Sequence, residues 1–282
     1  MTAPAPGRDR GRRIDLHAHT TRSDGVLTPS ALVEHALARG VGTLAVTDHD
    51  TLRGLPEATA RGADLGVEVI AGIEATAFRD GQEIHILGFF VDPASRPLAE
   101  TFARLRARRL ERMHRMIERL ADLGVRVDAA EVLTREGASY GRPHLARALV
   151  ARGACASVDE AFERWLAEGR PAYVEKVLLP SAEAIAAIRA AGGVPALAHA
   201  GRYRREPDIA ALSAEGLRGL EVYHPAHDAA ATRRYASIAR ELGLAPSGGS
   251  DFHGDPGRRP DLGEIDVPAG CLDELNAART GV

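Results

Sequence analysis

Short apolar runs alternate with segments of helical periodicity along the first third and the last third of the chain. Runs rich in Val, Ile, Leu and Ala that are bounded by Gly, Pro or Asp are typical of buried strands, and apolar positions three and four residues apart are typical of helices. On this basis we expect strands at residues 14–17, 43–47, 67–73, 83–90, 194–198, 220–223 and 244–247. We expect helices at residues 29–38, 52–65, 181–191 and 232–242, and a short helix that ends at Leu212.

Repeated strand–helix units predict a parallel sheet, because each helix returns the chain to the edge at which the preceding strand began. The expected strands predict a closed or nearly closed α/β barrel, and a doubly wound open sheet is the structural alternative. Between Pro97 and about Val174 the alternation gives way to an almost wholly helical segment rich in Ala, Arg, Leu and Glu. We therefore expect a barrel made of residues 13–96 and 175–282, with residues 97–174 inserted as a helical cap.

Composition narrows the class of protein. The chain has 282 residues, of which 27% are charged, and a net charge of −3, which is ordinary for a globular protein and excludes a generally basic protein that coats nucleic acid. The two cysteines, Cys155 and Cys271, argue against a disulfide framework and against a zinc site made of thiolates. Residues 1–12 are rich in Pro, Gly and Arg, and we expect them to be a disordered tail. Since no segment resembles a signal peptide or a membrane span, we expect a cytoplasmic protein, and a monomer is the default expectation.

Side chains that commonly bind metals occur at or near the ends of almost all the expected strands. In parallel α/β folds the loops at the carboxyl ends of the strands carry the functional site, so these side chains are expected to meet at one edge of the sheet. One HxH pair or one strand-end histidine is most often a coincidence or a packed polar residue, but so many buried polar groups without partners would each cost several kcal/mol. The side chains are His17, His19, Asp24, His49 with its neighbours Asp48 and Asp50, Glu74, His85, His199, His224, Asp251 and His253.

Imidazole nitrogens and carboxylate oxygens are suitable ligands for zinc, manganese and iron. His17 and His19 are two residues apart in an extended segment, so both side chains project to the same side and can bind one ion. A carboxylate such as that of Glu74 can bridge two ions. Divalent ions placed side by side bind a phosphoryl group and generate hydroxide at neutral pH, so the pattern predicts hydrolysis of a phosphate ester or an amide.

Six separate motifs, in order between residues 15 and 254, resemble those of the PHP (polymerase and histidinol phosphatase) superfamily. The motifs are DLHAHTTRSDG, TDHDT, GIE, HILG, the Ala198–His199 pair and SDFHG. Within this superfamily the chain resembles the small stand-alone phosphoesterases that include a 5′→3′ exoribonuclease and a nucleoside 3′,5′-bisphosphate phosphatase. The resemblance implies a distorted (β/α)₇ barrel, which agrees with the strand–helix alternation, with the helical insertion as its cap.

The resemblance also implies a site for two to three divalent ions, Mn²⁺, Fe²⁺ or Zn²⁺, with a hydroxide between ions as the nucleophile. Asp251 would be both a ligand and a catalytic residue. Some relatives have His at the position of Asp24, which bears on metal preference, and the family often has Pro where Ala200 stands here. The implied ligands are His17, His19, Glu74 and Asp251 for one ion, Glu74, His85 and His199 for a second, and Asp24, His49 and His253 for a third.

Candidate contacts to the substrate lie outside the ligand motifs. His224 follows an expected strand, where relatives place a group that contacts phosphate or donates a proton; a general acid and a hydrogen-bonding role behind the ligands are equally open. Arg142 and His144 open a helix of the insertion, where a guanidinium group and a helix N-terminus both favour phosphate, although a structural salt bridge is an equal alternative for Arg142. Arg202 is a further candidate. The arginines at residues 104–119 are expected on a solvated helix face rather than in a basic patch.

The leading hypothesis is a metal-dependent phosphoesterase that acts on a phosphomonoester or on the 5′ end of a nucleotide or short RNA, such as AMP, a nucleoside 3′,5′-bisphosphate or a 5′-phosphorylated oligonucleotide. Histidinol-phosphate phosphatase is the enzymatic alternative, since it shares the metal motifs. An amidohydrolase would commonly use a carboxylated lysine, and the one lysine of the chain, Lys176, lies at no expected strand end. A degenerate binding domain would have lost ligands at the motif positions, and this chain has retained them.

Overall fold

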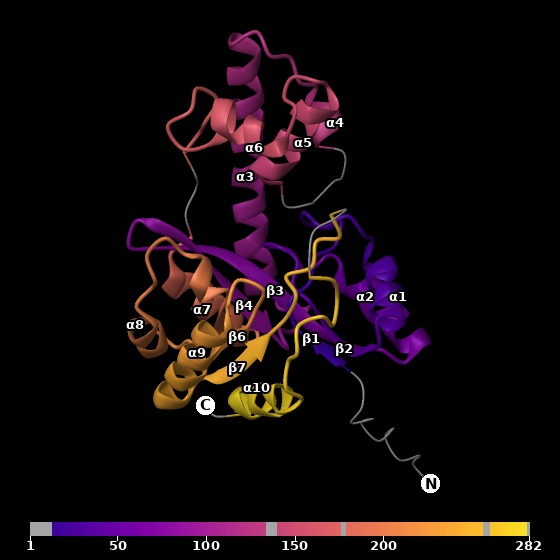
Figure 1. Ribbon diagram of the computed structural model, residues 1–282, viewed down its shortest axis with the longest axis vertical. Helices are drawn as coiled ribbons and strands as arrows, with labels where there is room; N and C mark the ends of the chain where they lie inside the picture. Colours follow the sequence, from indigo (N-terminus) through magenta and orange to yellow (C-terminus); the bar gives the residue numbers. More distant parts are fainter. Residues whose placement is uncertain (1–12, 134–139, 176–178, 256–259, 281–282) are drawn as a thin grey trace.

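The computed structural model describes residues 13–133, 140–175, 179–255 and 260–280. The expected tail at residues 1–12 and Lys176 lie outside the described residues. One seven-stranded sheet forms the centre of the main body, with its strands in chain order (Figure 1). The strands are β1 (Arg13–Asp15), β2 (Val41–Val46), β3 (Glu68–Arg79), β4 (Gln82–Phe89), β5 (Val194–Leu197), β6 (Gly219–Tyr223) and β7 (Ala245–Gly248).

The sheet is mixed, which corrects the expectation of a wholly parallel sheet. β1, β2 and β3 pair in parallel, as do β5, β6 and β7, but β4 is antiparallel to both β3 and β5. The cause is the tight connection at Asp80 and Gly81, whose φ angles of 48° and 81° are those of a two-residue hairpin turn. Such a turn joins antiparallel strands directly, so this connection needs no crossover helix.

β3 is longer than expected and extends to Arg79 instead of ending at residue 73. Glu74 therefore lies in the middle of a strand rather than at its end. In the antiparallel register Thr76 is opposite His85, so Glu74 and His85 are diagonal neighbours on one face of the hairpin. The hairpin thus brings two ligand-type side chains together from strand interiors.

The two edges of the sheet approach each other just beyond β1. The Leu16 N–H donates to Gly248 O at 3.0 Å, and Ala18 forms an isolated parallel bridge with Phe252. These contacts place the segment that carries His17 and His19 beside the loop that follows β7.

The helices of the main body are α1 (Pro29–Ala38), α2 (Leu55–Leu65), α7 (Ser181–Ala190), α8 (Ile209–Ala214), α9 (Ala229–Leu242) and α10 (Gly270–Thr280), with a 3₁₀ turn at Ala200–Arg202. Helices pack along the sheet: α1 against β2 and α2 against β3, α7 against the central strands β3 to β5, α9 against β6 and β7, and α10 against β7 (Figure 1). The short helix at the C-terminus, α10, was not predicted; its Cys271, Leu272 and Leu275 pack against Ile14 and Ala245 of the sheet. So few apolar positions give only weak helical periodicity, which explains why the sequence did not indicate it.

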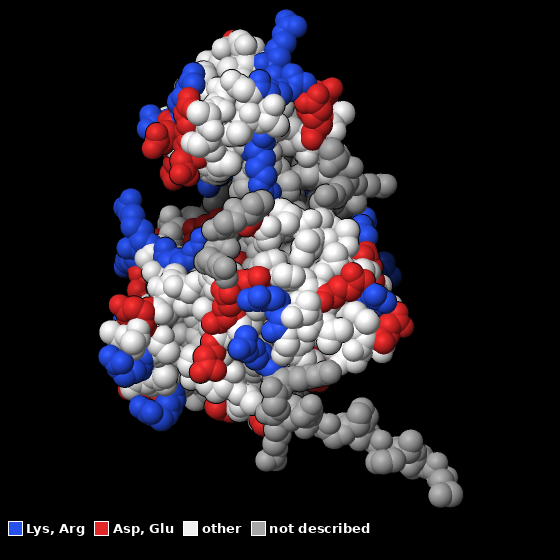
Figure 2. All heavy atoms as spheres, turned by 45° about the vertical axis from the view of Figure 1, so that its right-hand side comes forward, with Lys and Arg blue, Asp and Glu red and all other residues white. Residues whose placement is uncertain are grey.

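Residues 96–133 and 140–174, which we call the helical lobe, stand on the main body as a separate group of helices (Figures 1 and 2). The long helix α3 (Arg96–Asp122) begins against the main core through Leu98 and Phe102 and rises into the lobe, whose buried apolar side chains form a core of their own. After α3 the helices are short, so the segment is less uniformly helical than expected. They are α4 (Ala129–Val132), α5 (Arg142–Ala151), α6 (Val158–Ala161) and a π-helical turn at Phe162–Leu166.

Among the residues that the structure describes, no helix combines the length and the apolar character needed to cross a bilayer. The surface seen in Figure 2 carries acidic and basic side chains interspersed over both the lobe and the main body. That mixture agrees with the small net charge of the chain.

Candidate metal centre

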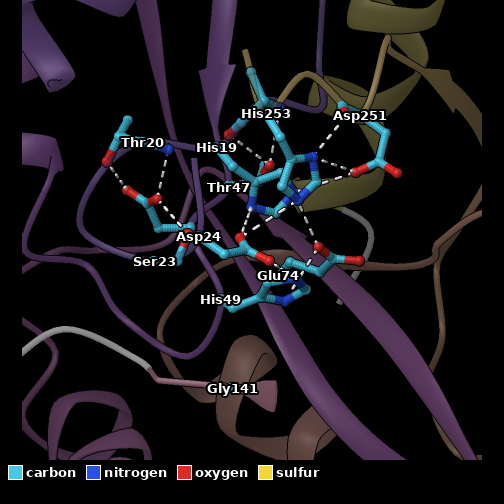
Figure 3. A network of polar contacts seen from close by, with 12 residues as sticks. His19, Thr20, Ser23, Asp24, Thr47, His49, Glu74, Gly141, Asp251 and His253 are labelled. Carbon is cyan, nitrogen blue, oxygen red and sulfur yellow. Dashed lines mark hydrogen bonds and ion pairs between the residues drawn. The ribbon is translucent and has the colours of Figure 1, made fainter. Parts of the chain in front are cut away.

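The ligand-type side chains meet at the edge of the sheet that faces the helical lobe. In Figure 3 the side chains of His19, His49, Glu74, Asp251 and His253 point toward one another. They come from elements far apart in the sequence: His17 and His19 follow β1, Asp24 lies in the next loop, His49 follows β2, Glu74 and His85 lie in β3 and β4, His199 follows β5, His224 follows β6, and Asp251 and His253 follow β7.

Glu74 lies at the centre of the cluster and is 1% exposed. Its Oε2 atom is 3.2 Å from both His17 Nε2 and His19 Nε2 and 3.3 Å from His49 Nδ1. Its other oxygen, Oε1, is 2.8 Å from the Nδ1 atom of His85 and 3.0 Å from the Nε2 atom of His199. A carboxylate with imidazoles around both oxygens has the placement expected of a bridging ligand.

The described side chains form three groups, each with its ligand atoms within 4.8 Å of one another. The first and third groups have the membership that the resemblance implied, except that His19 also belongs to the third. The second contains His49 where His199 was implied, and His199 contacts Glu74 from its own side. The groups are His17, His19, Glu74 and Asp251; His49, Glu74 and His85; and His19, Asp24, His49 and His253.

Several buried atoms of the cluster have no hydrogen-bond partner among the described residues. They include both ring nitrogens of His19, Nδ1 of His49 and Oδ1 of Asp24. Their nearest polar neighbours are other ligand-type atoms of the cluster, such as Glu74 Oε2 at 3.2 Å from His19 Nε2, in a geometry that forms no hydrogen bond. Nitrogen and oxygen atoms that converge in this way suit zinc, manganese or iron. The side chains therefore fit a group of divalent ions.

Burial and the nearby carboxylates have opposite effects on the pKa values of the histidines in the cluster. Burial lowers the pKa of His49 to about 3, so this imidazole is held in the neutral form that binds metals. Burial also acts to lower the pKa of His19, but the nearby Asp251 and Glu74 carboxylates outweigh it and raise that pKa to about 10. A proton on His19 would have to leave when a metal binds.

Glu221 of β6 is a residue of the site that the sequence interpretation missed. It is fully buried; His17 Nδ1 donates to its Oε1 at 2.9 Å, and the His199 N–H donates to its Oε2 at 2.6 Å. Burial acts to raise the pKa of Glu221, but attraction to His17 outweighs it and lowers that pKa to about 2. The bond fixes the proton of His17 on Nδ1 and leaves Nε2 facing Glu74. The available signal was one glutamate inside the otherwise apolar strand LEVY.

Two buried aspartates hold the loops that carry ligands. Asp15 accepts the backbone N–H groups of Ser250 and Gly263, both at 3.0 Å, and so joins the end of β1 to the loop that contains Asp251. Asp48, grouped with the ligand-type residues by sequence, instead accepts hydrogen bonds from the Thr20 N–H and Thr20 Oγ1 at 2.7 Å and from Ser23 Oγ at 2.6 Å. It stabilises the loop before Asp24.

A hollow of about 440 Å³ lies between the cluster and the helical lobe. Its cluster side includes Glu74, His85 and Asp251, and its lobe side includes Arg109, Arg112, Tyr140, Arg142 and Arg147. Arg109 and Arg112 belong to the arginine-rich segment that was expected on a solvated face. In the structure these two side chains face the hollow instead.

The expected substrate contacts have different surroundings. Arg142 lies over the rings of Phe162 and Tyr173, 5.4 and 5.8 Å from their centroids, in the wall of the hollow. His144 has both nitrogens engaged, because Nδ1 accepts from the Gly141 N–H at 3.2 Å and Nε2 donates to Ser23 O at 3.1 Å. His144 therefore has no ring nitrogen left for a substrate phosphate in this arrangement.

Two further candidates lie beside Asp251. Arg202 Nη1 donates to Asp251 Oδ2 at 2.7 Å, and His224 Nε2 is 3.6 Å from the same oxygen. Both line a smaller hollow of about 190 Å³ next to the cluster. The Nδ1 atom of His224 accepts from the Ala226 N–H at 3.0 Å, so a neutral His224 ring carries its proton on Nε2.

Comparison with known proteins identifies close relatives. A 3′,5′-nucleoside bisphosphate phosphatase from Chromobacterium violaceum is 36% identical over 268 residues, covering 92% of this chain and 93% of that protein. The 5′-3′ exoribonuclease Rnm of Escherichia coli (strain K12) is 36% identical over 255 residues, covering 85% of this chain and 84% of that protein. A phosphoribosyl 1,2-cyclic phosphate 1,2-diphosphodiesterase from Eggerthella lenta is 36% identical over 265 residues, covering 90% and 99%.

A solved structure from Bifidobacterium adolescentis, provisionally described as a metal-dependent phosphoesterase, matches with a TM-score of 0.87 and 36% identity over 95% of this chain and 96% of that one. The model of the PHP domain matches residues 15–169. These findings give no support to the histidinol-phosphate alternative. The chain therefore belongs to the PHP domain family, and it is a metal-dependent phosphoesterase.

Proposed function

We propose that this phosphoesterase hydrolyses a phosphomonoester or the 5′ end of a nucleotide or short RNA. The three relatives named above are each 36% identical to the chain although their substrates differ, so identity alone does not select the substrate. The observation that carries the proposal is the hollow between the cluster and the lobe, which has metal ligands on one side and guanidinium groups on the other. Such a site can bind a reacting phosphate and a second anionic group together.

The proposed ligands are those implied by the motifs: His17, His19, Asp24, His49, Glu74, His85, His199, Asp251 and His253. When bound, two or three divalent ions would supply positive charge to the phosphoryl oxygens and lower the pKa of a water molecule. The protein contributes the buried carboxylates and neutral imidazoles that hold those ions in a fixed arrangement.

The anionic part of the substrate is proposed to bind at Arg112 and Arg142. Arg112 is 8% exposed; its Nε donates to Val174 O at 2.7 Å, while its Nη2 has no hydrogen-bond partner among the described residues. Its guanidinium lies 5.5 Å from the Tyr173 ring that Arg142 also contacts. No carboxylate of the described residues forms an ion pair with either arginine, which disfavours the salt-bridge alternative for Arg142. Burial and the neighbouring Arg142 lower the pKa of Arg112 to about 10, and an anion between the two would relieve their repulsion.

His224 is proposed to donate a proton to the leaving oxygen. Its Nε2 atom lies 3.6 Å from Asp251 Oδ2 beside the smaller hollow. To act as the donor the ring would have to be the imidazolium, with Nδ1 released from the Ala226 N–H, because a neutral imidazole cannot give up its one N–H proton. The competing role, a hydrogen bond that orients Asp251, is separated by varying the leaving group. Loss of a proton donor in His224→Asn lowers kcat most for substrates with poor leaving groups, whereas loss of an orienting contact lowers kcat for all substrates alike.

The experiment that tests the proposed function measures the release of inorganic phosphate and of mononucleotides, with and without added Mn²⁺ after treatment with a chelator, because cleavage at the 5′ end of an RNA frees a nucleotide rather than phosphate. The substrates are AMP, adenosine 3′,5′-bisphosphate, a 5′-phosphorylated oligoribonucleotide, phosphoribosyl 1,2-cyclic phosphate and histidinol phosphate. We expect release from at least one of the first three, lost with the chelator and restored by Mn²⁺. Release from the cyclic phosphate or from histidinol phosphate alone would overturn the nucleotide assignment.

A further inference from the structure

We propose that the helical lobe positions one end of the metal cluster, so that binding of the ion at His19, Asp24, His49 and His253 depends on lobe side chains that are not ligands. The inference rests on the proposed metal site. It assigns a metal-positioning role to His144, Arg147 and Arg109, which lie on the lobe rather than on the sheet.

The first contact comes from the start of α5. The Nε2 atom of His144 donates to the backbone oxygen of Ser23, the residue before Asp24, at 3.1 Å. Because Nδ1 already accepts from the Gly141 N–H, the neutral ring has its proton on Nε2, as this bond requires. The contact joins the lobe to the loop that carries Asp24.

The second contact comes from the next turn of the same helix face. Arg147 donates to the backbone oxygen of Asp24 through Nη1 at 3.4 Å and Nη2 at 3.5 Å. Its Nη2 atom also donates to Asp255 Oδ1 at 3.2 Å, two residues after His253. One guanidinium group therefore spans the loops that carry two ligands of the same group.

The third contact comes from α3. Arg109 Nη2 is 2.7 Å from Asp50 Oδ2, and Arg106 donates to the backbone oxygen of the same residue. Asp50 is fully buried, directly follows His49 and has a φ of 53°, a conformation that needs support from its surroundings. Its Oδ1 atom accepts from the Thr76 N–H at 2.8 Å, so the lobe, the His49 loop and β3 are joined at one side chain.

Three of the four ligand-bearing positions of this group thus have lobe contacts beside them. Residues that orient ligands without binding the metal typically contribute 10- to 100-fold in metal affinity, as a rough expectation. Loss of the lobe contacts should weaken this one ion and leave the group around His17 and Glu74 loaded. If these contacts served only to dock the lobe on the main body, their loss would leave metal affinity unchanged.

The test is metal content of the full chain at controlled free Mn²⁺, measured by elemental analysis, with Mn²⁺ electron paramagnetic resonance as a second readout. The variants are Arg147→Ala and His144→Ala. We expect about one equivalent fewer than in the parent chain at limiting Mn²⁺, a 10- to 100-fold weaker affinity for that ion, and recovery at excess Mn²⁺. His144→Gln, which can still donate to Ser23 O, should recover part of the affinity.

The matched control is Arg164→Ala, because Arg164 is an exposed lobe arginine that pairs with Glu160 within one helical turn. It should bind as much Mn²⁺ as the parent chain. Unchanged stoichiometry and affinity in folded Arg147→Ala and His144→Ala proteins would overturn the inference. If the parent chain itself bound no Mn²⁺, the proposed metal site would fail instead, so the two failures are distinguishable.

Discussion

The two ends of the metal cluster are held by different kinds of contact. Around His17 the supporting groups belong to the sheet and are fully buried: Glu221 is 0% exposed and Asp15 is 1% exposed. Around Asp24 and His253 the support includes the pair of Arg147 and Asp255, whose side chains are 38% and 30% exposed. We call these the sheet end and the lobe end.

The difference in burial indicates at which end of the cluster the loss of a supporting contact costs less. Removing one partner from a buried charged contact typically costs about 3–5 kcal/mol, because the other partner stays buried and unpaired. Partly exposed ion pairs contribute about 0–1 kcal/mol to the free energy of unfolding, since water can replace the lost partner. The sheet end is therefore expected to be rigid, and the lobe end is expected to yield first.

The largest expected effect comes from a ligand of the sheet end. Asp251→Asn removes one of the two carboxylate charges of the group around His17, so kcat/KM should fall by at least about 1,000-fold while the fold is retained. The measurement is phosphate release at saturating Mn²⁺ with circular dichroism as the check of folding. Asp261→Asn, which alters a carboxylate paired with His35 away from the cluster, is the control and should keep its activity. Near-normal turnover of Asp251→Asn would contradict the ligand assignment.

A smaller loss is expected from the buried support of the sheet end. Glu221→Gln keeps the shape but offers an amide where the carboxylate accepts from both His17 and His199, so metal affinity should fall by roughly 10- to 100-fold. The measurement is Mn²⁺ affinity of Glu221→Gln, Arg147→Ala and the double variant.

Independent ends would give free-energy changes that add to within about 0.5 kcal/mol in this double-mutant cycle. A double variant that is no worse than Glu221→Gln alone would show that the cluster behaves as one unit. The sheet end and the lobe end would then not be independent parts of the cluster.

The smallest effect is expected from Arg142, a lobe residue whose backbone contact is to Leu166 O within the lobe and not to a loop of the cluster. Arg142→Ala should raise KM by roughly tenfold through loss of a charged hydrogen bond to substrate phosphate, with little change in kcat. Metal content should stay at the level of the parent chain, in contrast to Arg147→Ala. Arg142→Lys keeps the charge and tests whether the planar guanidinium is required. An unchanged KM would reduce Arg142 to a structural role.

Much of the cluster could be predicted because its side chains follow from local pattern. His17, His19, His49 and Asp251 stand just after apolar runs, and the topology of the sheet gathers such positions at one edge. Glu74 was also predicted to be a ligand, and the structure places it in the cluster although its strand continues past it. The chemistry of the residue types was more informative than the exact strand boundary.

The rest depended on contacts between distant segments. Glu221 was missed because a lone acid inside a strand shows its partner only when His17 is brought beside it from another strand. His144 was expected to contact substrate, but its partner is the backbone of Ser23, and backbone acceptors leave no mark in a sequence. The antiparallel β4 was missed because the strand–helix alternation suggested a parallel sheet despite the turn at Asp80 and Gly81.

The spacing of His144 and Arg147 has a consequence for protein engineering. Residues three apart share one face of a helix, so the first two turns of α5 contact the loops around Asp24 and Asp255 through this one pair of side chains. A chimera that exchanges the lobe to change substrate choice would need to carry this pair in register. A graft that shifted α5 by one residue would turn both side chains away from the loops around Asp24 and Asp255. The new enzyme would then need more Mn²⁺ in its buffer to work.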